Sequence, residues 1–172
     1  MKVLKFGGSS IATPERLKHV LELIKQAEAE SQIAVVVSAF GGVTDQLIGM
    51  IKQAEKGQDI YLNDYKIFVD KHAEMLKSVS SGHRQIELLE NITSYTTRLG
   101  EILRGIFLVR HVAPKTYNQV LSYGERLSAR IITSGLLELG GEAEFIDARK
   151  LIRTDDNYGN GIVDFEISTQ NI

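Results

Sequence analysis

Two short apolar segments, each followed by a pair of glycines and then by a helical pattern, most constrain the fold of this chain. The first covers residues 3–6, and the second, residues 33–38, is an almost unbroken β-branched run. Such a run is typical of a strand buried on both faces of a parallel sheet. The order strand, helix, strand, helix is that of a βαβ unit, so the sequence predicts an α/β fold with a mostly parallel sheet.

The helices of this unit have recognisable ends. Thr13 is a favourable N-cap, and Pro14 suits the first position of the helix between the two strands. That helix carries one apolar stripe at helical spacing, made of Leu17, Val20, Leu21, Ile24 and Ala27. The helix after the second strand is expected to be capped by Thr44 and Asp45 and to end at Gly57.

A long helical region follows. Residues 58–112 contain no strand pattern, and their apolar residues recur at helical intervals, so we expect two or three helices with a break at 80–82. Pro114 is expected to interrupt this series. A further helix is predicted over residues 119–138.

The last third of the chain contains the remaining strand candidates. Residues 142–147 are interpreted as a third strand of the sheet. Residues 152–154 and 162–165 flank a turn-rich loop and predict a hairpin, although the loop is long for one. No internal repeat or low-complexity segment is present.

Composition excludes several classes of function. A net charge of −2 without runs of like charge argues against a nucleic-acid binder. The absence of cysteine excludes disulfides, thiolate metal sites and a cysteine nucleophile. No apolar run reaches the roughly 18 residues of a membrane span, and Gly7 and Gly8 interrupt the N-terminal apolar stretch too early for a signal peptide. We therefore expect a soluble, cytoplasmic, single-domain protein without a membrane or nucleic-acid partner.

The first glycine pair is the most informative candidate site. Residues 5–10 read Lys-Phe-Gly-Gly-Ser-Ser and lie between a predicted strand and a helix, where ligands bind in open α/β sheets. Two glycines let backbone N–H groups approach an anion, and Lys5 adds positive charge, so the segment can form a phosphate cradle. The alternative is a simple turn with a solvated lysine, since this is not a Walker motif.

Two further segments carry polar groups beside glycines. Residues 38–45 repeat the arrangement after the second strand, and the two turns would either line one cleft or be unrelated. Residues 122–126 combine both charge signs with a glycine, for which a solvated helix face is the simpler interpretation. The histidines have no common spacing and are assigned to neither catalysis nor metal binding; they are His19, His72, His83 and His111.

These segments, in this order, resemble the aspartokinases of the amino acid kinase family. Residues 5–10 resemble the family's opening Lys-Phe-Gly-Gly-Thr/Ser-Ser, and residues 38–45 resemble its second substrate loop. Gly124 and Glu125 are similar to its substrate-binding glutamate segment, and residues 145–149 to the strand ending that follows. The resemblance extends over the whole chain, and the helical insert and hairpin look closer to bifunctional aspartokinase–homoserine dehydrogenases.

The resemblance implies a fold and a reaction. The fold would be a three-layer sandwich on a mostly parallel sheet, incomplete here, with a helical insert. The reaction would convert L-aspartate and ATP, with Mg²⁺, into 4-phospho-L-aspartate and ADP, the first step toward lysine, threonine and methionine. The nucleophile is the substrate's own carboxylate, whose pKa of about 3.9 leaves it ionised at neutral pH. No general base is then required, and catalysis reduces to positioning and charge stabilisation.

The resemblance also implies roles for individual residues. Lys5 would be catalytic, stabilising charge on the transferred phosphoryl group. Thr44 and Glu125 would bind aspartate, the latter through its ammonium group. The residues implied to hold the phosphates of ATP, or to lie beside them, are Gly7, Gly8, Ser9 and Ser38. No residue is assigned as a metal ligand.

The family's later elements are absent from these residues. A Gly-Arg-Gly-Gly-Ser-Asp type segment, the nucleotide-binding elements and the regulatory domains do not occur in residues 1–172. We therefore expect the N-terminal, amino-acid-binding part of a kinase domain, inactive alone. An incomplete sheet leaves apolar surface open, so a homo-oligomer is expected. Alternatives are a non-catalytic anion or amino-acid binding module, or a kinase with another acceptor.

Overall fold

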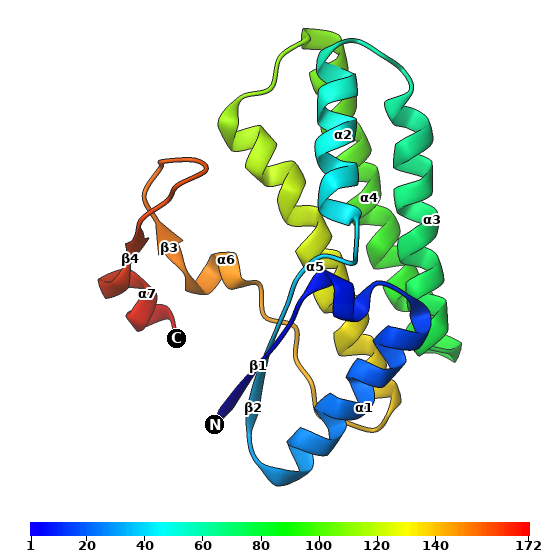
Figure 1. Cartoon of the computed structure of the whole chain (residues 1–172), viewed down its shortest axis with the longest axis vertical. Helices are drawn as coiled ribbons and strands as arrows, with labels where there is room; N and C mark the ends of the chain where they lie inside the picture. The colour runs from blue at the N-terminus through cyan, green and yellow to red at the C-terminus, as the bar shows by residue number, and fades with distance from the viewer.

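The structure is a computed structural model that describes all residues, 1–172. Helices dominate it, and the strands form two separate two-stranded sheets (Figure 1). The elements in chain order are β1 (Lys2–Phe6), a 3₁₀ turn η1 (Gly8–Ile11), α1 (Pro14–Glu30), β2 (Ile33–Val37), α2 (Val43–Glu55), α3 (Tyr61–Val79), α4 (Gly82–Val109), α5 (Pro114–Glu138), α6 (Ala148–Leu151), β3 (Arg153–Thr154), β4 (Val163–Asp164) and α7 (Phe165–Asn171).

The expected βαβ unit is confirmed. β1 and β2 pair in parallel, with Leu4 opposite Val35, and α1 connects them. Burial of the second strand on both faces was predicted and is wrong. Val35 packs against the core, whereas Val3 and Val36 on the other face are 63% and 49% exposed. The helices that contact β2 are α1 and α5, and the exposure of Val3 and Val36 leaves the opposite face of the sheet uncovered.

The start of α1 follows its sequence signals. The Thr13 hydroxyl accepts a hydrogen bond from the Arg16 backbone N–H at 3.4 Å, and Pro14 occupies the first turn. The predicted apolar stripe lies in the core apart from Ala27, which is half-buried. The start of α1 depends on interactions within four consecutive residues, so it can be predicted without knowledge of the tertiary structure.

The start of α2 differs from the prediction. Thr44 and Asp45 are not caps, because the helix already begins at Val43 behind Gly42, which has a φ of 80°. Glycine adopts this left-handed conformation without strain, so the chain turns into the helix earlier than a side-chain cap would allow. Gly57, with a φ of 65°, follows the end of α2 as expected.

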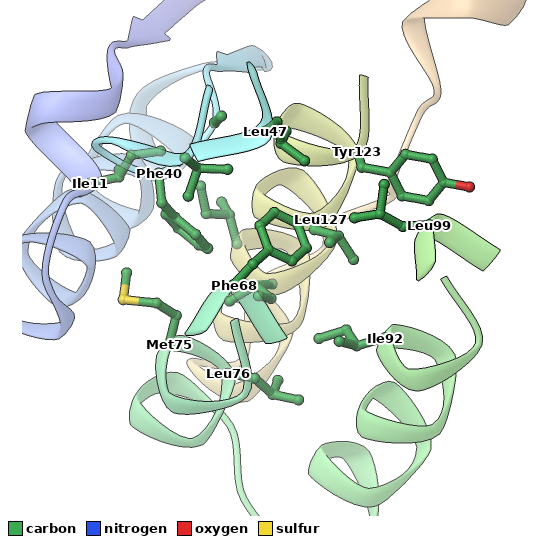
Figure 2. Packing of buried hydrophobic residues seen from close by; sticks show 14 of the residues in the cluster. Ile11, Phe40, Leu47, Phe68, Met75, Leu76, Ile92, Leu99, Tyr123 and Leu127 are labelled. Carbon is green, nitrogen blue, oxygen red and sulfur yellow. The ribbon is translucent and has the colours of Figure 1, made fainter. Parts of the chain in front are cut away.

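The region from 58 to 112 forms two helices, α3 and α4, which pack with α2 and α5 as a bundle (Figure 1). Pro114 interrupts the series as expected, and it also begins α5, five residues before the expected start of that helix. Proline is well accommodated at the first position of a helix, where its missing N–H would have no partner. Figure 2 shows Phe68 of α3 and Leu127 of α5 next to each other inside this bundle, with Phe40 reaching toward it from the turn after β2, and all three are buried.

The predicted third strand is wrong. Residues 142–147 pair with neither β1 nor β2, and the Glu142 N–H donates instead to the Glu28 side chain at 3.1 Å. A strand exists only where a neighbour completes its backbone hydrogen bonds, which this segment lacks.

The predicted hairpin is confirmed as the short antiparallel pair β3–β4. Asp155 orders its loop by accepting hydrogen bonds from the backbone N–H groups of Asn157 and Ile162, at 3.2 and 3.0 Å. This hairpin, α6 and α7 chiefly contact one another, and they lie to the left of the helical bundle in Figure 1. None of the helices combines the length and apolar character that a membrane span requires.

Candidate functional site

The glycine turns after β1 and β2 pack directly against each other. The Ser38 N–H donates to the Phe6 carbonyl at 3.1 Å and so continues the β1–β2 ladder into the turns. A Cβ atom on Gly8 would lie 2.7 Å from the Ala39 carbonyl oxygen. A Cβ on Gly41 would lie 3.2 Å from the Gly8 carbonyl oxygen. Only glycine permits such an approach, and the two turns are therefore one structural unit rather than unrelated turns.

The third candidate segment reaches the same place from α5. A Cβ on Gly124 would lie 2.7 Å from the Ala39 Cβ and 3.1 Å from Val43 Cγ1. The Ser128 hydroxyl donates to the Ser38 carbonyl at 2.7 Å. Glu125 precedes Ser128 by three residues, so both lie on the same side of α5. The three segments singled out in the sequence thus converge at the carboxyl ends of β1 and β2.

Two cations fix the backbone of these turns. Arg16 Nη1 donates to the Ser9 carbonyl oxygen at 2.8 Å, from α1. Lys71 Nζ donates to the Gly41 carbonyl oxygen at 2.6 Å, from α3. These two hydrogen bonds hold the carbonyl groups of Ser9 and Gly41 in place, so the turns have a defined shape before any ligand binds.

The candidate side chains differ in exposure. Lys5, Ser9, Thr44 and Glu125 are exposed, and Ser38 is half-buried, so all of them are accessible to a ligand. The remaining two positions are Gly7, which is exposed, and Gly8, which is half-buried.

No hydrogen bond or ion pair joins Lys5 to another candidate residue. The Lys5 side chain lies on the open face of the sheet, which is the face of Val3, because alternate residues of a strand share a face. The structure therefore brings the backbone segments together and leaves the Lys5 ammonium free of a protein partner.

A buried histidine supports the second turn. His72 on α3 lies against Phe40 of that turn, with ring centroids 5.5 Å apart, and against Phe68 at 4.2 Å. Its Nδ1 is 2.7 Å from the Phe68 carbonyl oxygen, and its Nε2 has no partner. Burial lowers the pKa of His72 to about 4, so the ring is neutral at physiological pH. A neutral, enclosed ring packs as part of the core.

Sequence reasoning missed a cluster of arginines and aromatic rings beside Glu125. The guanidinium groups of Arg126 and Arg130 lie over the Tyr95 ring of α4, at 4.7 and 4.6 Å from its centroid. Arg130 also lies 4.1 Å from the Phe145 centroid. Arg126 is separated by more than thirty positions from its α4 partner, so no local pattern could have joined them.

A model of the amino acid kinase family matches residues 1–172. Among curated proteins, the chain is 26% identical over 160 residues to the chloroplastic bifunctional aspartokinase/homoserine dehydrogenase 2 of Arabidopsis thaliana, covering 93% of this chain and 17% of that protein. It is 30% identical over 163 residues to the chloroplastic aspartokinase 1 of the same plant, covering 92% and 27%. For the bifunctional enzyme of Buchnera aphidicola the identity is 31% over 177 residues, covering 100% and 21%. The chain thus spans between a sixth and a third of the length of these relatives.

Solved structures agree on the fold. Escherichia coli aspartokinase III in complex with lysine and aspartate superposes with a TM-score of 0.86 at 20% identity, covering 99% of this chain and 36% of that chain. The same enzyme with aspartate and ADP gives 0.86 at 22%, with the same coverage. Clostridium acetobutylicum aspartate kinase gives 0.74 at 22%, covering 100% and 35%. The expected fold class, an incomplete α/β domain with a helical insert, is thereby confirmed, and the chain belongs to the amino acid kinase family.

Proposed function

We propose that residues 1–172 form the amino-acid-binding part of an aspartate kinase. The reaction transfers the terminal phosphoryl group of ATP to the side-chain carboxylate of L-aspartate, giving 4-phospho-L-aspartate and ADP. This is the first step of the route to lysine, threonine and methionine. The observation that carries the proposal is the convergence of Gly8, Ala39 and Gly124 at one end of the β1–β2 pair. The relatives named as aspartokinases, and neighbours bound to aspartate and ADP, support the same reaction.

Two side chains are proposed to hold aspartate. Glu125 is exposed on the side of α5 that carries Ser128, and its carboxylate suits the substrate's ammonium group. Thr44 is exposed in the first turn of α2, where its hydroxyl and the positive end of the helix suit a carboxylate. Together they would recognise an amino acid rather than a simple dicarboxylate.

Phosphoryl transfer needs charge stabilisation rather than a base, because the attacking carboxylate is already ionised. Lys5, exposed and without a protein partner, is proposed to stabilise charge on the transferred group. The first glycine turn would bind phosphate oxygens through backbone N–H groups and a hydroxyl. The residues proposed for this contact are Gly7, Gly8, Ser9 and Ser38.

Mg²⁺ is proposed to accompany the nucleotide. No group of three or more histidine, aspartate and glutamate side chains comes together in the structure. Magnesium commonly keeps several water ligands and binds through substrate phosphates with one or two carboxylates. Its ligands here would thus come mainly from ATP and water, and the protein residues would position those phosphates.

The nucleotide-binding half is proposed to lie outside these residues, with residues 58–112 as the helical insert. The relatives extend well beyond the matched region, since the chain covers 17% of the Arabidopsis thaliana bifunctional enzyme and 27% of aspartokinase 1 from the same plant. We therefore expect the 172-residue chain alone to show little turnover.

Self-association is also proposed. Val3 and Val36 present apolar surface on the open face of the sheet, at 63% and 49% exposure. Apolar sheet surface favours pairing with a second chain. Light scattering at high protein concentration is expected to give a mass above 19.1 kDa, and a monomer throughout would contradict this.

The kinase proposal is tested by trapping the acyl phosphate with hydroxylamine. A complete protein containing these residues should form aspartyl hydroxamate in an ATP-dependent manner, and the 172-residue chain should remain near background. Lys5→Ala should lower kcat by roughly 10²- to 10³-fold, whereas Lys66→Ala, an exposed lysine of α3, should not. Faster turnover of L-glutamate than of L-aspartate would contradict the proposed acceptor.

A further inference from the structure

A positively charged cluster lies between α4, α5 and the segment that leads to α6. We call it the arginine cluster and define it as Arg126, Arg130, Arg149, Tyr95 and Asp147. Figure 1 shows the chain returning from the end of α5 toward α6, which carries Asp147 and Arg149 back to the middle of α5. The cluster includes none of the residues to which the proposed kinase reaction assigns a role.

Two of its arginines share a single aromatic ring. Arg126 and Arg130 both lie over Tyr95, and Arg130 Nη2 donates to the Tyr95 hydroxyl at 2.6 Å. Cation–π contacts offset part of the cost of placing two like charges together, but they add no negative charge. The Tyr95 ring therefore does not neutralise the positive charges of Arg126 and Arg130.

The only carboxylate in contact with these arginines is already engaged. Asp147 accepts hydrogen bonds from Arg149 on both oxygens, at 2.9 and 2.6 Å, and a third from the Arg149 backbone at 3.2 Å. Arg126 Nε lies 3.7 Å from Asp147 Oδ2, which is too long for a hydrogen bond. Two guanidinium groups thus face one carboxylate, and Arg130 has no carboxylate partner.

Buried polar groups in this cluster lack partners. The Nε atoms of Arg126 and Arg130 are buried and make no hydrogen bond. Most buried polar atoms in folded proteins have a partner, so two unpaired Nε–H groups from residues four positions apart on α5 require an explanation. The electrostatic environment of Tyr95 is likewise positive. Burial raises the pKa of Tyr95, but the neighbouring Arg126 and Arg130 lower it by more, so the pKa lies below its usual value.

We propose that the arginine cluster binds a small oxyanion, a carboxylate or a phosphate, through the guanidinium groups of Arg126 and Arg149. A guanidinium group matches the two oxygens of either anion in a forked hydrogen-bond geometry. Arg149 provides access, because its side chain is 53% exposed, whereas that of Arg126 is 15% exposed. Binding there does not require the proposed kinase reaction and does not use Glu125.

Asp147 competes with the ligand in this arrangement. Its carboxylate occupies Arg149 in the free protein, and an incoming anion would share or replace that contact. Removing the carboxylate while keeping the shape of the side chain should therefore tighten binding, whereas removing the Arg149 charge should weaken it. A purely structural cluster predicts neither effect on anion affinity.

The test is an NMR titration that follows the arginine Nε–Hε signals of the full 172-residue chain. Inorganic phosphate is one probe and succinate the other, and the probe that binds more tightly identifies the class of anion. We expect saturable shifts of the Arg126 and Arg149 signals. Arg149→Gln should weaken binding by roughly tenfold or more, and Asp147→Asn should strengthen it. The control, Arg98→Gln, changes an exposed arginine of α4 and should leave affinity unchanged.

Two outcomes would overturn the proposal. One is the absence of saturable shifts with either probe. The other is equal weakening by Arg149→Gln and Arg98→Gln, which would indicate nonspecific attraction to surface charge. Because Asp147 also caps α6 by accepting from the Arg149 N–H, the thermal melting of each variant is measured first. If Asp147→Asn is unfolded, Arg126→Lys, which keeps the charge but loses the fork, should weaken binding in its place.

Discussion

Gly124 of α5 touches Ala39 in the turn after β2 so closely that a Cβ at position 124 would lie 2.7 Å from the Ala39 Cβ. Ala39 is 3% exposed, so it is enclosed by neighbouring atoms. This contact is what allows α5 to present Glu125 beside the ends of both strands. The geometry of the candidate site therefore depends on the absence of a side chain at one helical position.

Replacing this glycine should be destabilising even though alanine is the better helix former. We expect Gly124→Ala to lower the free energy of unfolding by about 1–3 kcal/mol, because overpacking outweighs the gain in helix propensity. The control is Gly105→Ala in α4, where an added Cβ meets nothing within 4 Å, and which should be neutral or stabilising by up to about 1 kcal/mol. Urea unfolding measures both, and similar effects at the two sites would contradict the packing argument.

The first glycine pair gives a second contrast between neighbours. A Cβ on Gly8 would lie 2.7 Å from the Ala39 carbonyl oxygen, whereas one on Gly7 would meet nothing within 4 Å. Gly8→Ala should therefore cost about 1–3 kcal/mol of stability, and Gly7→Ala, at a φ of −78°, less than about 0.5 kcal/mol. Denaturant titration of the two variants distinguishes a packed turn from an open one. Equal losses would show that the two turns do not pack as described.

The hydroxyl of Ser128 joins α5 to the second turn. Ser128 is fully buried and donates to the Ser38 carbonyl at 2.7 Å. Ser128→Ala should cost about 1–3 kcal/mol, because it leaves that carbonyl without this partner. Ser122→Ala, which removes a hydroxyl bonded only to its own helix, should cost less than about 0.5 kcal/mol. Thermal melting checks the difference, and equal losses would mean that the inter-element bond contributes nothing.

His72 should make stability depend on pH. Burial lowers its folded-state pKa to about 4, below the usual 6.5 that applies when the chain is unfolded. Between these values the unfolded chain binds more protons, so the stability from this residue is complete above pH 6.5 and is lost as pH falls toward 4. The full loss is on the order of 3 kcal/mol.

Unfolding measured from pH 7 to pH 4 checks this. His72→Leu should flatten the decline in stability over that range, while His83→Leu, an exposed histidine, should leave the decline unchanged. An unchanged decline in His72→Leu would show that the buried ring does not control it.

The parts of the fold that were predictable are those whose signals lie within a few residues. Thr13 and Pro14 define the start of α1 locally, and the β-branched run gave β2 because such residues suit a strand in any context. The strand expected at residues 142–147 failed because strand formation depends on a neighbour, which no local pattern reports. The caps predicted for α2, Thr44 and Asp45, were wrong for a similar reason. The helix begins directly after Gly42, and the left-handed conformation of this glycine was not visible in the sequence.

For the candidate site, the sequence located the segments but not their relationship. The two glycine pairs and Gly124 were all singled out, yet whether the turns shared one cleft stayed open until the contacts of Ala39 were known. Arg126 was noted only as a charge on a helix face. Its partners, Tyr95 and Asp147, come from distant segments, so the arginine cluster could be found only from the structure.

The central claim is that the converging turns and α5 bind L-aspartate, and calorimetry tests it most directly. L-Aspartate should bind the protein saturably, and Glu125→Gln should weaken binding by roughly tenfold or more, because it removes the charge that pairs with the ammonium group. The matched control is Glu90→Gln, an exposed glutamate of α4, which should bind like the unaltered protein. Aspartate affinity that is absent, or that is identical in Glu125→Gln and the unaltered protein, would contradict the account.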